Sequence, residues 1–517
     1  MRSGAPLVLA CVLCSAACSR VREAEPNDHF TQATPIPGAC KVVGTLASAS
    51  DIDVFKLETS KPGQSLDLRV GGIRDIDFVL KVMDGERREL KRYDETSLGG
   101  DERALDVGLD PGAYYIELSN KNPKADNKTQ EYSLDVQLGP AEGREREPDD
   151  RALEATPLKP GGVMRGHYFP SRNLLNEANA FQEEDWFKVA IPQEGRWLLN
   201  VDVSEVPGVD PILEIYDLNS YMLKALDTTG PGGAESFKGF GVKGPAEFRL
   251  RLRSKSVNSA NAEVPYQILS ELLPYQGSYE FEPNDQRLDA TPFEGESMQG
   301  TASPVGDADW YRITVPQDSR RILCVSLSGV IGMDLRMTLA DDLGNPLREI
   351  DDAGEEQPES LTGVGLTGGD AYLIVAEKTG KKAEPRRAYT LTRTLVEAQP
   401  GLEFELNDSS ATAQALQLGS SVDGFIAPRG DVDCYEFNVY SKGLVVVEAT
   451  GVLNVTHSLE LHDADGGPLS QALARKPGEG VTLSKELDPG TYVLRLKPQD
   501  PKQVNVRDKY TLRIRGK

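Results

Sequence analysis

A short acidic motif occurs four times along this chain of 517 residues. Its copies are Glu25-Pro26-Asn27-Asp28, Glu147-Pro148-Asp149-Asp150, Glu282-Pro283-Asn284-Asp285 and Glu405-Leu406-Asn407-Asp408. Each copy is followed by an acidic pair that leads into an aromatic strand, and the second acids of these pairs are Asp53, Asp185, Asp309 and Asp433. These acids recur at a spacing of roughly 125 residues, the length of a whole domain rather than of a solenoid unit. The chain is therefore predicted to be an array of four homologous modules.

The modules are predicted to consist of β-strands. After the acidic pairs, apolar and polar residues alternate, as in Phe55-Lys56-Leu57 and Tyr311-Arg312-Ile313, and this period of two is typical of half-buried strands. Turn signals such as Asp110-Pro111-Gly112 precede further strands, and no long helical period is present. We expect an all-β fold of four tandem antiparallel β-sandwich modules, jelly-roll-like in form, over residues 23–138, 145–271, 280–395 and 403–515.

The second module departs most from the others. Asp149 stands in place of the asparagine, Glu183 stands in place of the first acid of the pair, and an insertion lies within residues 168–182. Any site that the other three modules share is least secure in this one.

The N-terminus is typical of an export signal. Arg2 supplies a positive charge, and the apolar stretch that follows is too short to span a bilayer, which takes about 20 residues. Ser15-Ala16-Ala17-Cys18 resembles a bacterial lipobox, so residues 1–18 are expected to be a lipoprotein signal ending at a lipidated Cys18. Because Ser19 rather than an aspartate follows, the outer membrane is the expected location within the cell envelope. The alternative is an ordinary secretory signal cut near Ala17.

Net charge and the absence of catalytic motifs limit the classes of function that the chain can have. The chain has 57 basic and 81 acidic residues, a net charge of −24, which disfavours nucleic acid and anionic membrane surfaces as partners. Its four histidines form no zinc-binding spacing, and no Gly-x-Ser-x-Gly or phosphate-binding glycine loop is present. We therefore expect a protein that is not an enzyme and has no catalytic residues.

Several repeated motifs carry a family resemblance. Glu-Pro-Asn-Asp, a following glycine, Asp-x-Asp-aromatic, Asp-x-x-Gly and Pro-Gly-x-Tyr together resemble the bacterial pre-peptidase C-terminal domain, in four copies over nearly all of residues 23–515. The resemblance implies β-sandwich modules, found appended to secreted peptidases, with an adhesion, targeting or stabilising role. In some members it implies calcium at the N-terminal edge of the module.

The acidic motifs themselves also suggest calcium, which takes about six to eight oxygen ligands. Two acids at positions i and i+2 of a strand share one face, and a divalent cation would relieve the repulsion between converging carboxylates. The candidate ligands in modules one, three and four are Glu25, Asn27, Asp28, Asp51 and Asp53; Glu282, Asn284, Asp285, Asp307 and Asp309; and Glu405, Asn407, Asp408, Asp431 and Asp433. The alternative is that these residues form a capped turn and merely begin a strand.

The leading hypothesis is a lipid-anchored cell-envelope protein of non-catalytic modules. It would bind polysaccharide, matrix or another envelope protein, or serve as a scaffold, and its contact with the membrane would be the N-terminal lipid. The alternative is an accessory, chaperone or inhibitor subunit of a secreted enzyme.

Overall fold

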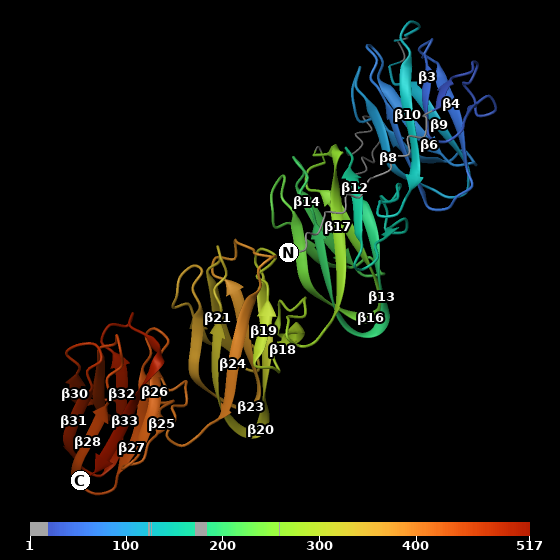
Figure 1. Cartoon of the computed structure of the whole chain (residues 1–517). Helices are drawn as coiled ribbons and strands as arrows, with labels where there is room; N and C mark the ends of the chain where they lie inside the picture. The colour runs from blue at the N-terminus through green and yellow to red at the C-terminus, as the bar shows by residue number, and fades with distance from the viewer. Residues whose placement is uncertain (1–18, 123–124, 126, 171–182, 258, 517) are drawn as a thin grey trace, which may run out of the picture. The chain divides into compact units, whose positions relative to one another are not determined.

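The computed structural model describes residues 19–122, 125, 127–170, 183–257 and 259–516. Cys18 and the rest of the expected signal lie outside the described residues, as does most of the insertion in the second module. Within the described part the chain is all-β with several sheets, and its one helical element is a 3-10 turn, η1 (Arg287–Asp289) (Figure 1). No helix there is long and apolar enough to cross a membrane.

The sequence ranges 23–138, 145–271, 280–395 and 403–515 are called repeats 1 to 4. Repeat 1, with the residues just before it, forms two five-stranded sheets of order β1-β3-β10-β5-β8 and β2-β4-β9-β6-β7. Side chains from both sheets, such as Phe55 of one and Leu68 of the other, belong to one buried cluster, so the sheets face each other across a shared core. The strands are β1 (Ser19–Arg22), β2 (Thr34–Ile36), β3 (Cys40–Gly44), β4 (Ile52–Thr59), β5 (Gln64–Val70), β6 (Phe78–Met83), β7 (Glu89–Tyr93), β8 (Glu102–Leu109), β9 (Gly112–Asn120) and β10 (Tyr132–Pro140).

Repeat 4 has the same pairing pattern, in sheets of order β25-β27-β32-β29-β30 and β26-β33-β28-β31. Its buried cluster again draws on both sheets, for example through Tyr435 and Val447. Its strands are β25 (Gln414–Ala415), β26 (Ser421–Ile426), β27 (Asp433–Val439), β28 (Gly443–Ala449), β29 (His457–Asp463), β30 (Pro468–Leu473), β31 (Val481–Leu487), β32 (Gly490–Pro498) and β33 (Asn505–Gly516).

Repeats 2 and 3 differ, because the strands of each form one seven-stranded sheet. In repeat 3, β20 and β23 pair first through Ala308–Val315 and then, after a register shift, through Arg320–Leu327. The first stretch corresponds to β4 with β9 of repeat 1, and the second to β5 with β8. Side chains of both stretches belong to the same buried cluster, so the two long strands pass from one layer to the other without a break. The expectation of separate sheets in every module is corrected here for repeats 2 and 3.

The strands of repeat 2 are β11 (Thr156–Pro157), β12 (Val163–Tyr168), β13 (Asp185–Val203), β14 (Pro211–Tyr216), β15 (Met222–Leu226), β16 (Glu235–Ser254) and β17 (Asn261–Pro274). Those of repeat 3 are β18 (Thr291–Pro292), β19 (Ser297–Gly300), β20 (Ala308–Leu327), β21 (Leu335–Ala340), β22 (Pro346–Ile350), β23 (Glu359–Glu377) and β24 (Tyr389–Glu397).

The pairing is not purely antiparallel, which is a second correction. The short strand after each acidic motif runs parallel to the strand after the acidic pair, as β2 does with β4 and β18 with β20. The strand between them in sequence, β3 or β19, pairs elsewhere, with β10 or β24. A connection that leaves and returns in this way brings the chain back in the same direction, which gives a parallel pair.

The chain divides into two compact units. The first holds the described residues up to Glu194 together with Val201–Ser236 and Gly244–Leu272, and the second holds Gly195–Asn200, Phe237–Lys243 and Leu273–Lys517. Parts of β13 and β16 of repeat 2 therefore belong to the second unit.

Candidate functional site

The acidic motif folds back onto the start of the strand that carries the acidic pair, in all four repeats. The backbone carbonyl of the third motif residue accepts a hydrogen bond from the amide that follows the second acid: Val54 to Asn27 at 3.1 Å, Trp186 to Asp149 at 3.1 Å, Trp310 to Asn284 at 3.0 Å and Cys434 to Asn407 at 3.1 Å. The motif also turns on itself, because the amide of Asn284 donates to Glu282 Oε2 at 2.8 Å and that of Asn407 to Glu405 Oε2 at 2.9 Å. Two acidic segments far apart in sequence are thereby brought together.

The result is an acidic cluster in each repeat. Three carboxylate oxygens lie within 4.8 Å of one another in each of the groups Glu23, Glu25 and Asp53; Glu147, Asp149 and Asp185; Glu282, Asp285 and Asp307; and Glu403, Glu405 and Asp433. These groups, with the acids adjoining them, are called clusters 1 to 4.

The remaining candidates adjoin the clusters. Asn27, Asn284 and Asn407 are fully buried, and Asp51, Asp309 and Asp431 are buried as well. Asp28 accepts from the Ile52 amide at 3.3 Å and thereby joins the two segments of cluster 1. Asp408 is exposed and contacts Arg348, as described below.

One glutamate of each cluster was missed in the sequence. Glu23, Glu145, Glu280 and Glu403 stand two residues before the acidic motif in every copy, which is a signal the sequence does contain. Each accepts a hydrogen bond from a backbone amide: Thr45 at 2.7 Å, His167 at 2.9 Å, Thr301 at 2.8 Å and Phe425 at 2.9 Å.

A tyrosine from the last long strand of each repeat closes the cluster. The hydroxyl of Tyr132 donates to Asp53 at 2.6 Å, that of Tyr266 to Asp185 at 2.8 Å, and that of Tyr389 to Asp309 at 2.6 Å. In repeat 4, Tyr510 donates to Glu403 instead, at 2.5 Å. A glycine faces this group, for example Gly166, where a Cβ would collide with the Glu145 carboxylate and the Tyr266 hydroxyl.

Cluster 2 contains a lysine from repeat 1. Lys91 of β7 is 4% exposed, and its ammonium forms ion pairs with Glu147, with Glu183 at 2.7 Å and with Asp150 at 3.7 Å. Burial lowers the pKa of Lys91, but these carboxylates outweigh burial and hold that pKa well above its usual value. Burial also raises the pKa of Glu147, Asp149, Glu183 and Asp185, and the neighbouring acids raise it further. The glutamate that replaces aspartate at position 183 therefore binds a side-chain cation.

Cluster 4 contains an arginine from repeat 3 at the same register position. Arg348 of β22 pairs with Leu339, as Lys91 of β7 pairs with Val82. Its guanidinium contacts Asp408, lies 3.4 Å from Asp431 and lies 3.9 Å from Glu405. Burial raises the pKa of Glu405 to about 7 even though Arg348 opposes the shift. In each of clusters 2 and 4, one positive side chain thus forms ion pairs with more than one acid.

In cluster 1, burial and neighbouring carboxylates raise the pKa of the acids. Burial raises the pKa of Asp53 to about 8, Tyr132 opposes the shift, and Glu23, Asp51 and Glu25 add to it. Burial likewise raises the pKa of Glu25 and Asp51. In cluster 3, burial and the adjoining acids Glu280 and Glu282 raise the pKa of Asp309 well above its usual value. Both clusters offer oxygen donors, the ligand type that calcium takes.

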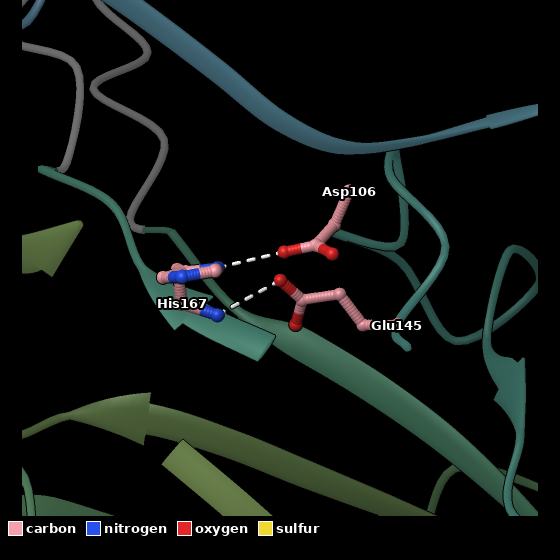
Figure 2. A group of neighbouring side chains, drawn as sticks. All are labelled: Asp106, Glu145 and His167. Carbon is pink, nitrogen blue, oxygen red and sulfur yellow. Dashed lines mark hydrogen bonds and ion pairs between the residues drawn. The ribbon is translucent and has the colours of Figure 1, made fainter. Parts of the chain in front are cut away.

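A histidine of repeat 2 contacts an aspartate of repeat 1. The His167 ring nitrogen Nδ1 lies 2.7 Å from Asp106 Oδ2, and the His167 amide donates to Glu145 at 2.9 Å (Figure 2). Asp106 also accepts from Arg144 Nε at 2.5 Å, and Glu145 accepts from Tyr266 at 2.5 Å. The group is therefore a polar connection between repeats 1 and 2.

Comparisons with known proteins concern the fold. No family model and no curated protein match the chain. Among solved structures, the pre-peptidase C-terminal domain of a collagenase from Bacillus anthracis matches with 18% identity and a TM-score of 0.18, over 20% of this chain and 94% of that one. A biofilm-associated protein BSP domain matches with 10% identity and a TM-score of 0.14, over 94% of this chain and 98% of that one.

A third match covers 76% of this chain and 41% of the other, with 9% identity and a TM-score of 0.16. It is the M60 catalytic domain with the CBM51-1 and CBM51-2 domains of Clostridium perfringens ZmpB.

Proposed function

We propose that this chain is a non-catalytic, lipid-anchored array of four β-sandwich modules that binds or scaffolds partners in the cell envelope. The observation that carries the proposal is the repeated cluster. Its buried acids are held by backbone amides and tyrosine hydroxyls, and in clusters 2 and 4 also by a lysine or arginine of the preceding repeat, so these polar groups join and stabilise modules. An array built in this way presents module surfaces to polysaccharide, matrix or envelope proteins.

Calcium is a second part of the proposal, limited to repeat 1. Cluster 1 offers converging oxygen ligands that fit the ion, and calcium bound there would offset the charge of buried carboxylates. Cluster 4 does not fit, because Arg348 already places positive charge against Asp408, Asp431 and Glu405, and cluster 2 does not fit because of Lys91. In repeat 2, Lys224 pairs with Ile215 and so holds the register position of Lys91 and Arg348. Repeats 3 and 4, for which the sequence suggested calcium, are therefore left out of this proposal.

The test of anchoring and partner class uses the native chain and a Cys18→Ala variant. The native chain is expected in the membrane fraction, with a lipidated Cys18 in its mass spectrum, and the variant is expected to be released or to mature poorly. An unmodified N-terminus beyond Cys18 would refute the anchor. Material purified from membranes is then screened on glycans, collagen-like and cell-wall ligands, and a stoichiometric secreted enzyme in place of such a ligand would favour the accessory-subunit alternative.

A further inference from the structure

The same backbone contact recurs wherever one repeat follows another. The glutamate that begins the acidic motif pairs in parallel with a strand of the preceding repeat, which is β8, β16 or β23. The pairs are Glu147 with Val107, Glu282 with Phe240 and Glu405 with Val364. Each contact has two hydrogen bonds. The glutamate amides donate to Asp106, Gly239 and Gly363 at 2.9, 2.9 and 3.1 Å, and the glutamate carbonyls accept from Gly108, Gly241 and Gly365 at 2.9, 2.6 and 2.6 Å.

The receiving strand is shaped for this contact. The residue whose carbonyl accepts from the glutamate amide has a left-handed φ, 59° at Asp106, 79° at Gly239 and 76° at Gly363, and a register shift marks a bulge there in β8 and β23. Its glycine lies against the residue between the two glutamates, so that a Cβ at Gly108, Gly241 or Gly365 would collide with Arg146, Phe281 or Phe404. A receiving half therefore consists of a bulged strand with a glycine, and a basic residue holds one register position in all three, as Lys91, Lys224 and Arg348.

Repeat 4 lacks every part of the receiving half. β31 pairs with β28 without a register shift, so it has no bulge. Lys485 and Glu486, both exposed, lie opposite Val445 and Leu444, where the equivalent residues of repeat 1 are Val107 and Gly108. Ser470 pairs with Leu461 and so takes the register position of Lys91 and Arg348. Charged side chains on an edge strand oppose pairing with another strand, so the end of repeat 4 is blocked.

Repeat 1 carries the complementary half. Its Glu23-Ala24-Glu25-Pro26-Asn27-Asp28 keeps both glutamates and the final aspartate of the segments that dock in repeats 2 to 4, with Ala24 in the place of Arg146, Phe281 and Phe404. Ala24, Glu25 and Pro26 are exposed, whereas Glu147, Glu282 and Glu405 are 1%, 1% and 2% exposed. The segment that is buried in the later repeats is accessible in the first, and the acids of cluster 1 lie beside it.

We propose that residues 23–28 of repeat 1 are a docking surface for a different protein, which presents a bulged, glycine-containing β-strand edge and a lysine or arginine side chain. The strand edge would pair with Glu25 as β8 pairs with Glu147, and the cation would enter cluster 1 as Lys91 enters cluster 2. A second copy of this chain does not fit, because the end of repeat 4 is blocked. The inference rests on the proposed function as a binding array and names the place and chemistry of one partner.

The test supplies the missing half on the chain itself. In the full-length soluble chain with Cys18→Ala, the residues Ser484-Lys485-Glu486 are replaced by the Thr-Gly-Val-Gly of 362–365, together with Ser470→Arg. The unmodified end should leave the chain monomeric in sedimentation equilibrium. The grafted chain should form head-to-tail oligomers whose mean mass rises with concentration, and Glu25→Lys in the grafted chain should restore the monomer.

A second variant guards against a graft that fails to fold. A chain ending at Glu397 leaves the native receiving half of repeat 3, with Arg348 and residues 363–365, uncovered by repeat 4, whose core is its own. It should also oligomerise, and Glu25→Lys should again prevent this. Monomers from both variants, with folding confirmed by circular dichroism, would overturn the docking surface, as would oligomers that persist with Glu25→Lys. Neither result touches the scaffold function, which membrane purification tests separately. Oligomers that dissociate when calcium is added would show that the ion competes with the arginine side chain for cluster 1, and this result would support the docking surface.

Discussion

Clusters 1 and 2 are built from the same motif in neighbouring repeats, yet their charges are balanced differently. In cluster 2, a 4% exposed lysine from repeat 1 lies among Glu147, Asp150 and Glu183. In cluster 1, the charges that act most strongly on Asp53 are carboxylates, and Glu25 is exposed. The difference shows that the repeated motif fixes where negative charge gathers, whereas the position of a repeat in the array decides what neutralises it. The predictions below remove, restore or measure that neutralising charge.

The largest effect is expected from Lys91→Met. The substitution leaves buried carboxylates in cluster 2 without their ion-pair partner, and breaking such a pair costs about 3–5 kcal/mol in the free energy of unfolding. Urea denaturation monitored by circular dichroism measures the loss. Lys56→Met is the matched control, since the Lys56–Glu58 pair is exposed, and it should change little. Equal effects of the two variants would contradict the contrast drawn between the clusters.

A pH dependence is expected next, from cluster 1. Burial raises the pKa of Asp53 from 3.8 to about 8, so between these values the folded chain holds a proton that the unfolded chain has lost. The free energy of unfolding should therefore fall as the pH rises from about 4 to about 8. Asp53→Asn imitates the protonated carboxyl and should flatten this slope, which denaturation in chelator at several pH values would measure. A slope unchanged by Asp53→Asn would assign it to other groups.

Calcium should stabilise the chain through cluster 1. Binding to the folded state alone adds about 2.7 kcal/mol at a hundredfold excess over Kd. Calorimetric titration should give one site, and Asp53→Asn should remove it. Lys91→Met should add a site, because it leaves the acids of cluster 2 in need of a cation. A stoichiometry that ignores both substitutions would rule out the assignment.

The smallest effect is expected from the tyrosines that close the clusters. Tyr266→Phe deprives Glu145 and Asp185, both buried, of a hydroxyl donor, at a cost of about 1–3 kcal/mol. Tyr132→Phe should cost less, because one of its acceptors, Glu23, is only half-buried. Parallel urea titrations of the two variants give the comparison, and the reverse order would argue against it.

Much of the cluster geometry could be predicted from the sequence. Four ordered copies of two acidic segments imply that the segments meet, and the Val54–Asn27 backbone bond and its three equivalents confirm that they do. The upstream glutamates could have been found too, since Glu23, Glu145, Glu280 and Glu403 keep a constant spacing from the motif. They were missed because they lie outside the four-residue motif, two positions before its first residue.

The cations could not be found in this way. Lys91 precedes Glu147 by 56 residues and Arg348 precedes Asp408 by 60. Each stands at the same distance after the aspartate that follows the preceding strand, Asp84 or Asp341, but this spacing does not show which acids the cation meets. Only the register of β7 on β6 and of β22 on β21 places these side chains. The single sheets of repeats 2 and 3 were missed for a related reason. Whether a strand continues from one layer into the other or is interrupted between them depends on the pairing along the whole of β20 and β23.

The order of Lys91 and Arg348 in the chain has a consequence for biosynthesis. Both cations lie in the repeat before the acids that they neutralise, and chains emerge from the ribosome or an export channel N-terminus first. Repeat 1 can therefore be folded, with its lysine in place, before Glu147 and Glu183 arrive. Each of these cations is then a ready template on which the next repeat closes its buried acids, so the array is suited to assembly in one direction, as the chain is delivered.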